Sequence, residues 1–190
     1  SLVRIQYDPL FMKKIVVFGA SSSKKSINKQ FSIYASTQFN NTEIIILDLN
    51  DFEMPIFSED KELNFGIPEK ATKFYEILNC SDAIIISFAE HNGSYTAAFK
   101  NIFDWISRIG KIVWWDKPML LLSTSDGAGG ASSILVEAYK RISYGHQYDD
   151  LPKFSLPFFS KNFDENNGIK DSKLNEQFQN TISDFQNILF

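Results

Sequence analysis

A cluster of small polar side chains follows an apolar run near the start of the chain. Positions 15–20 hold five apolar residues and one glycine, which is how a strand buried on both faces of a parallel sheet reads. The polar residues that follow are Ser21, Ser22, Ser23, Ser26 and Asn28. Helix-like sequence then resumes, and the first turn of a helix presents unpaired N–H groups and the positive end of the helix dipole. We therefore predict a phosphate site here, with serine hydroxyls and the Asn28 amide as additional donors.

The spacing of this loop excludes two common phosphate motifs. It lacks the G-x-x-x-x-G-K-[ST] of a Walker A loop and the G-x-G-x-x-G of dinucleotide-binding Rossmann domains. A hydroxyl-rich loop suits a single phosphomonoester instead. The competing interpretation is that these side chains only cap the following helix.

Two further loops have compositions that suit a ligand. The segment 88–95 contains Glu90, His91, Asn92 and Gly93, of which Gly93 permits positive φ and His91 could lie against a flat ligand. The segment 125–131 is rich in glycine, which exposes backbone N–H groups. Taken alone, the first of these could be only turn and cap residues, and a glycine-rich turn is weak evidence.

Alternating strand-like and helix-like segments must position these loops. We predict strands at 15–20, 43–49, 83–87, 118–124 and 154–159, and helices at 26–41, 69–78, 96–108, 132–142 and 171–189. The segment 50–68 reads as a long loop that could form a lid or a subunit contact, and 162–168 reads as polar loop. Repeated βαβ units predict a parallel sheet whose ligand lies beyond the carboxyl ends of its strands.

Composition narrows the class of protein. The chain has 190 residues and a net charge of −4, which disfavours nucleic acid as a partner. No segment approaches the ~20 apolar residues of a membrane span. The single cysteine, Cys80, indicates a reducing, cytoplasmic location and is expected to pack as a small hydrophobe. Two histidines without a Cys/His cluster argue against a metal site.

The chain reads as one domain over residues 12–190. Residues 1–11 precede a natural-looking start at Met12 and carry no secretory signal pattern, so we interpret them as an expression-derived or upstream extension. An arm laid on a partner is the alternative for this segment.

Together the three loops resemble the NAD(P)H-dependent FMN reductase family. The family pattern G-S-x-R-x-x-S-x-N is matched by residues 20–28, and S-x-S-x-G-x-x-G-G is matched by residues 123–130. The pattern P-E-Y-N-x-x-x-P-x-x-L-K-N-x-x-D-W is matched by Ala89 to Asn92, by Phe99 to Asn101 and by Asp104-Trp105. The order and spacing of these matches extend from about residue 13 to residue 145, which makes the resemblance specific.

The resemblance implies an α/β fold of flavodoxin-like type. This is a three-layer sandwich with a five-stranded parallel sheet in the order 2-1-3-4-5 and helices on both faces. It implies FMN as the cofactor and NADPH or NADH as the co-substrate, with electrons passing to a small acceptor such as a quinone, an azo compound or a free flavin. It also implies a homodimer or homotetramer, and it requires no dedicated catalytic acid or base.

By the same resemblance, each loop contacts one part of the cofactor. The phosphate would be held by Ser21, Ser23, Ser26, Ile27 and Asn28. The isoalloxazine and ribityl groups would be lined by Glu90, His91, Asn92 and Gly93. The other edge of the ring would be closed by Ser125, Gly127, Gly129 and Gly130. Lys100-Asn101 and Asp104-Trp105 would be structural, fixing the helix behind the second loop.

The chain departs from the family patterns at four positions. Ala20 replaces a glycine, Ser23 an arginine, Ala89 a proline and His91 a tyrosine. The missing arginine removes a charge from the phosphate site, which Lys24 or Lys25 could restore. A histidine beside the flavin would alter its reduction potential and substrate preference.

Other interpretations stay open at this point. A flavodoxin-like FMN-binding electron carrier without its own NAD(P)H reaction is one, although −4 is a mild charge for docking redox partners. A small hydrolase is disfavoured because no G-x-S-x-G elbow is present. Phe57, Trp114 and Trp115 are candidates for a subunit contact or a lid, with core packing as the competing role.

Overall fold

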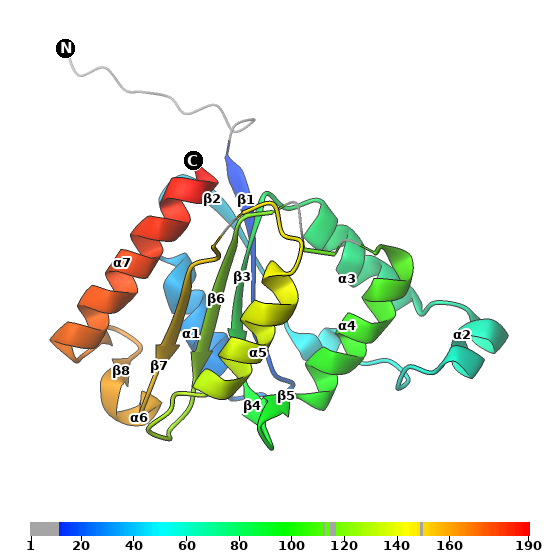
Figure 1. Cartoon of the computed structure of the whole chain (residues 1–190), viewed down its shortest axis with the longest axis horizontal. Coiled ribbons are helices and arrows are strands. Elements are labelled where there is room, and N and C mark those ends of the chain that lie inside the picture. The colour runs from blue at the N-terminus through cyan, green and yellow to red at the C-terminus, as the bar shows by residue number, and fades with distance from the viewer. Residues whose placement is uncertain (1–11, 112, 115–116, 149) are drawn as a thin grey trace, which may run out of the picture.

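The protein is a three-layer α/β sandwich built on a five-stranded parallel sheet in the order β2-β1-β3-β6-β7 (Figure 1). The computed structural model describes residues 12–111, 113–114, 117–148 and 150–190. The five strands are β1 (Lys13–Ala20), β2 (Thr42–Ile46), β3 (Ala83–Phe88), β6 (Met119–Thr124) and β7 (Lys153–Leu156). Counted along the chain, their order is 2-1-3-4-5, which confirms the predicted sheet. The extension assigned to residues 1–11 lies outside the described residues.

Alternate side chains of the strands pack into two separate cores, one on each face of the sheet. Ile15 and Val17 of β1 face α1 (Ile27–Ser36) and α7 (Ser172–Leu189). Val16 and Phe18 face the opposite layer. That layer contains α3 (Glu69–Asn79), α4 (Ala97–Ile109) and α5 (Ser132–Ser143). Because successive side chains of a strand point to opposite faces, an uninterrupted apolar run is what a sheet covered on both sides requires.

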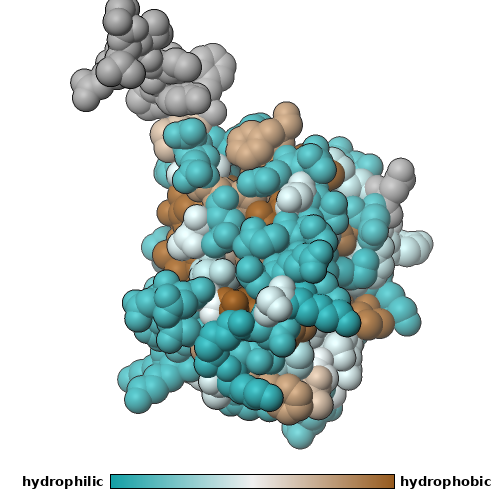
Figure 2. Space-filling model, turned by 90° about the vertical axis from the view of Figure 1, so that its left-hand side faces the viewer, coloured by the Kyte–Doolittle hydropathy of each residue, from teal (hydrophilic) through white to brown (hydrophobic). Residues whose placement is uncertain are grey.

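Local caps fix where the helices begin. Ser26 caps α1, Thr96 caps α4 and Asp171 caps α7, each accepting a hydrogen bond from a backbone N–H in the first turn. Among the described residues, no helix is long and apolar enough to cross a membrane. From the α7 side the surface is mainly hydrophilic, with apolar residues scattered over it (Figure 2).

The prediction of a long loop at 50–68 was wrong. This segment contains most of the short 3-10 helix η2 (Leu49–Phe52) and the helix α2 (Glu59–Phe65). Asp48 caps η2, and Ser58 caps α2. Since α2 buries none of its residues, it has no core-facing apolar stripe for a periodicity argument to detect.

Two shorter segments also differ from expectation. The predicted strand 154–159 ends at Leu156, because Pro157 has no N–H to continue the ladder, and Phe159 begins α6 (Phe159–Asn162). The segment 162–168, predicted as polar loop, contains β8 (Phe163–Asp164) and the first residue of β9 (Gly168–Ile169), which pair as a small antiparallel hairpin.

The structure also shows where the side chains that were expected to pack or to contact a partner lie. Cys80 is exposed at the C-terminal end of α3 and does not pack as a small hydrophobe. Trp114 is buried in the core of the α3–α5 layer, so the packing role holds for it. Phe57 packs edge-on against Trp105, with 5.0 Å between ring centroids. Trp115 lies outside the described residues.

Candidate functional site

The loop after β1 leads directly into the N-terminus of α1. The Ser26 hydroxyl accepts from the Lys29 N–H at 3.2 Å, which satisfies the third helical position. Ile27 and Asn28 occupy the first two positions, whose N–H groups have no acceptor inside a helix. A Cβ on Gly19 would lie 2.4 Å from the Lys29 nitrogen, so glycine is what lets α1 approach the end of β1. The loop therefore directs free N–H groups to the carboxyl edge of the sheet.

The Asn28 side chain joins two strands. It is 3% exposed, and its Nδ2 donates to the Thr124 carbonyl at 3.1 Å. Its Oδ1 accepts from the Ser87 hydroxyl at 2.8 Å and from the Thr124 N–H at 3.1 Å. The amide that the sequence suggested as a phosphate donor is thus committed mainly to holding α1 against the ends of β3 and β6. What Asn28 retains for a ligand is its backbone N–H and one amide hydrogen.

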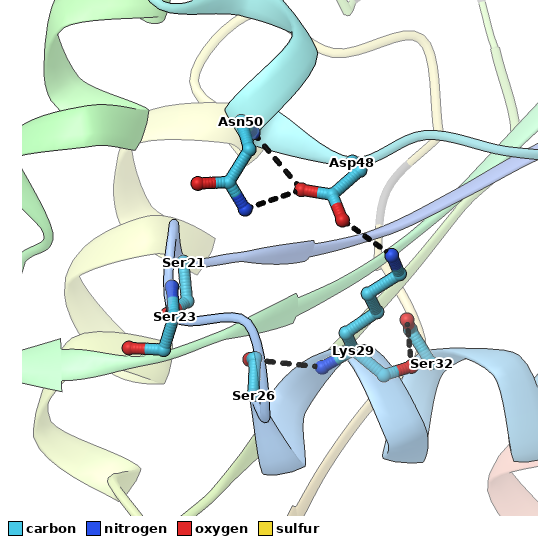
Figure 3. Close-up of polar contacts among 7 residues, drawn as sticks. All are labelled: Ser21, Ser23, Ser26, Lys29, Ser32, Asp48 and Asn50. Carbon is cyan, nitrogen blue, oxygen red and sulfur yellow. Dashed lines mark hydrogen bonds and ion pairs between the residues drawn. The ribbon is translucent and has the colours of Figure 1, made fainter.

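The lysine in the first turn of α1, Lys29, is turned away from the serine loop. Lys29 Nζ lies 2.6 Å from Asp48 Oδ2, and Figure 3 shows its side chain reaching toward Asp48 and Asn50 rather than toward Ser21 and Ser23. The hydrogen bond from Lys29 lowers the pKa of Asp48. Lys25, in contrast, lines a hollow together with Ser21, Ser23 and Ser26. It forms no ion pair with any described residue. Lys24 is exposed and does not line that hollow.

The second loop forms a tight hairpin, with β4 (Glu90–His91) pairing with β5 (Ser94–Tyr95). Its two turn residues, Asn92 and Gly93, have φ of 52° and 78°, as a type I′ turn requires. The Glu90 carboxylate accepts from the backbone N–H of Ile134 at 3.2 Å. Since the α5 N-cap residue Ala131 provides no side-chain acceptor, Glu90 is the anion at this helix N-terminus.

The third loop is fastened to the turn that follows β7. Gly127 and Ser125 accept through their carbonyl oxygens from the N–H groups of Phe158 and Phe159, each at 3.1 Å. Asp126 accepts from the Ser160 N–H at 2.8 Å, and this bond lowers the pKa of Asp126. These contacts could not be predicted from the sequence, because Ser160 lies 34 residues after Asp126 in the chain.

Gly130 lies against the end of β7. Its φ is 55°, and a Cβ there would lie 2.7 Å from Leu156. The hydroxyls of Ser123 and Ser155 donate to its carbonyl oxygen at 2.9 Å and 2.7 Å. Glycine at this position therefore has a structural reason that is independent of any ligand.

Two adjoining hollows extend over the carboxyl ends of β1, β3 and β6. The first has a volume of about 250 Å³, and the second about 260 Å³. The first is lined by Ser21, Ser23, Lys25, Ser26, Ile27, Asn28, Ala89, Glu90, His91, Thr124, Ser125 and Asp126. The second is lined by Glu90, Ser125, Gly129, Ala131, Ser132 and Ser133. Because they share Glu90 and Ser125, we treat them as one groove.

Most of the predicted site residues thus meet in one place. Asn92, Gly93, Gly127 and Gly130 do not line either hollow, although all four belong to loops that border the groove. Six residues line it that the sequence did not suggest, namely Ala89, Thr124, Asp126, Ala131, Ser132 and Ser133. Lys25, one of the two lysines suggested as a replacement for the missing arginine, lines it as well. Hydroxyls, a helix N-terminus and a lysine suit a phosphate at one end. Small residues at the other end leave room for a flat ring.

Comparisons with known proteins identify the family of this chain. The family model described as NADPH-dependent FMN reductase matches residues 13–138. A quinone reductase of Pseudomonas putida is 30% identical over 144 residues, covering 75% of this chain and 74% of that protein. An NADPH:quinone oxidoreductase of Arabidopsis thaliana is 28% identical over 135 residues, covering 70% of this chain and 68% of that one.

A solved structure extends the likeness to the whole fold. FerB, a flavoenzyme NAD(P)H:(acceptor) oxidoreductase from Paracoccus denitrificans, superposes with a TM-score of 0.72 over 94% of this chain and 97% of FerB, at 21% identity. The family match covers more than half of the chain and includes all three loops of the groove. The chain therefore belongs to the NADPH-dependent FMN reductase family, oxidoreductases whose cofactor is FMN and whose reductant is NAD(P)H.

Proposed function

We propose that this protein uses NAD(P)H to reduce FMN held in the groove and passes the electrons to a small acceptor, with quinones as the leading class. The observation that carries this proposal is the convergence of three loops on one groove, with donors for a phosphate at one end and small residues at the other. The quinone reductases among its relatives support the choice of acceptor. Azo compounds and free flavin are the further acceptors to test.

In this proposal the β1–α1 loop holds the phosphate. The N–H groups of Ile27 and Asn28 and the hydroxyls of Ser21, Ser23 and Ser26 would donate to it. Lys25 would supply the positive charge that arginine provides elsewhere in the family, since Lys29 is paired with Asp48. The two carboxylates of the groove, Glu90 and Asp126, are each held by a backbone N–H of a neighbouring element.

The flavin ring would lie at the other end of the groove. Glu90, His91 and Ser125 border it, while Gly129 and Ser132 leave space along its edge. FMN when bound supplies the hydride chemistry, so the protein needs to bind, orient and tune it rather than provide an acid or base. The glycine-rich loop would contribute backbone donors toward the ring edge. We also propose a cytoplasmic homo-oligomer.

A visible absorbance spectrum tests the proposal directly. The protein is mixed with FMN, desalted, and then treated anaerobically with NADPH or NADH. Retained flavin that bleaches with a nicotinamide, and reoxidises with a quinone, is the expected result. Retained flavin that stays oxidised with both nicotinamides would favour an electron carrier, and failure to bind FMN in a titration would contradict the assignment of the groove.

A further inference from the structure

The segment 56–66, here called the arm, carries a helix without internal support. Helix α2 buries none of its residues, and a helix of this length is not stable by itself in water. Three apolar side chains of the arm are largely exposed, namely Ile56 at 75%, Leu63 at 84% and Phe65 at 84%. In Figure 1 the arm stands out from the body of the molecule beyond α4. These side chains give the arm an apolar face that no described part of the chain covers.

The base of the arm is fixed to one side of α4. Asn101 accepts from the Phe57 N–H at 2.8 Å, and the Trp105 indole donates to the Pro55 carbonyl at 2.7 Å. Arg108 Nε lies 2.9 Å from a carboxylate oxygen of Glu62. Thus the motif residues Asn101 and Trp105, which were expected to fix the helix behind the second loop, tie that helix to the base of the arm. These contacts fix the arm from its base to Glu62 of α2, whereas Leu63 and Phe65 of the same helix extend into solvent.

A groove of about 510 Å³ lies on another side of α4, between α4 and α5. It is lined by Tyr95, Lys100, Phe103, Asp104, Ser107, Glu137, Lys140 and Arg141, and we call it the α4–α5 groove. Residues 101, 105 and 108 share one face of α4, whereas 100, 103, 104 and 107 share a different face. In Figure 1 α4 stands between the arm and α5. The arm of a given molecule is thus held away from its own groove.

The charges of the arm and of the α4–α5 groove are complementary. Within the arm, Lys61 Nζ donates to the Ile56 carbonyl at 2.7 Å and Glu62 pairs with Arg108, which leaves the negative charges of Glu59 and Asp60 unpaired. Within the groove, Lys100 pairs with Asp104. Lys140 and Arg141 form no ion pair with any described residue, and Glu137, near Ser94, is the remaining carboxylate.

The floor of the α4–α5 groove is aromatic and contains a hydroxyl without a hydrogen-bond partner among the described residues. Arg141 lies over the Phe103 ring, with its Cζ 5.7 Å from the centroid. The Tyr95 oxygen is buried and has no hydrogen-bond partner among the described residues, and burial raises the pKa of this hydroxyl. A buried polar group without a partner destabilises the free protein, and a backbone carbonyl or carboxylate of an incoming segment would accept the hydrogen bond of this hydroxyl.

We propose that two copies of the chain associate by exchanging arms, each arm lying in the α4–α5 groove of the other copy. A reciprocal contact of this kind closes a two-fold symmetric dimer and covers the apolar arm in both copies. It gives a surface to the homo-oligomer proposed above and depends on no property of the flavin. Tyr95 is the last residue of the β4–β5 hairpin, which borders the proposed FMN groove. The arm of one copy would therefore lie beside this hairpin of the other copy.

The test is the molar mass of the full chain by size-exclusion chromatography with light scattering, from about 1 to about 100 µM. A dimer is expected for the unmodified protein. An arm variant (Leu63→Glu with Phe65→Ser) and a groove variant (Lys140→Glu with Arg141→Glu) should each raise the dimer dissociation constant by ~10-fold or more. The control, Ile46→Ser, removes an apolar side chain that is 47% exposed on β2 and should leave the dimer unchanged.

Mixing the two variants gives the decisive result. A mixed dimer retains one intact arm in one intact groove, so it should form at concentrations where each variant alone is monomeric. A monomeric unmodified protein, dimers that survive the arm variant, or failure of the mixture to associate would overturn the proposal. FMN titration of the same variants separates this outcome from the fate of the proposed function, and circular dichroism shows whether each variant is folded.

Discussion

The Asn28 side chain forms two hydrogen bonds with the backbone of Thr124, 96 residues away in the chain. Its Nδ2 donates to the Thr124 carbonyl and its Oδ1 accepts from the Thr124 N–H, both at 3.1 Å. The same oxygen accepts from Ser87. One side chain therefore fixes the phosphate loop relative to the ends of two strands.

Replacing Asn28 by alanine should lower the free energy of unfolding by about 2–4 kcal/mol, because buried groups of Ser87 and Thr124 lose their partner. FMN binding should weaken as well, since the helix end is no longer fixed. Urea unfolding measures the first effect. Asn40→Ala, at an exposed position, serves as the control and should change stability by less than about 0.5 kcal/mol. Equal stability of the two variants would contradict the role of Asn28.

Replacing Lys25 by glutamine should raise the FMN dissociation constant by ~10-fold, a loss of about 1.4 kcal/mol for one charge-assisted contact. Riboflavin, which lacks the phosphate, should bind equally to both proteins. Quenching of flavin fluorescence measures both constants. Lys24→Gln removes the same charge outside the groove and should have little effect. If the two lysine variants weaken FMN equally, a diffuse charge effect replaces the specific one.

Replacing Glu90 by glutamine should destabilise the protein by about 0.5–1 kcal/mol, because α5 loses the negative charge at its N-terminus. If FMN occupies the groove as proposed, its midpoint potential should also rise, since removing a nearby negative charge favours the added electrons. Thermal unfolding and a spectroscopic redox titration report the two effects. Glu176→Gln, on the exposed surface of α7, should change neither.

The Lys29–Asp48 pair should give a pH-dependent contribution to stability. The folded protein lowers the pKa of Asp48, so the stabilisation is present above the ordinary carboxyl value of about 4 and is lost as the pH falls through the lowered pKa. Unfolding curves of the unmodified protein and Lys29→Met should differ by about 1 kcal/mol at neutral pH and converge in acid. Lys73→Met, which removes an exposed lysine of α3, should show no such convergence. A difference that is constant with pH would exclude the ion pair as its cause.

Much of the fold could be read from local sequence. Apolar runs such as Ile84–Ile86 and Met119–Leu122 are fully buried strands, and turn residues such as Asn92 and Gly93 have the positive φ that their types allow. Helix α2 was not predicted because its apolar side chains face no core of the same chain. Its caps are local signals, but they do not show a helix without a buried stripe. Periodicity detects a helix only through the side it buries.

The sequence by itself determined the five strands of the parallel sheet, the five helices that pack on it, the three loops at one edge of the sheet and the family. The tertiary structure decided what each loop residue does. It assigned Asn28 and Gly130 to support, and it turned Lys29 toward Asp48 while leaving Lys25 in the groove. The physical reason is that strand and helix patterns arise from neighbouring residues. The direction of a polar side chain, in contrast, is set by partners up to 96 residues away.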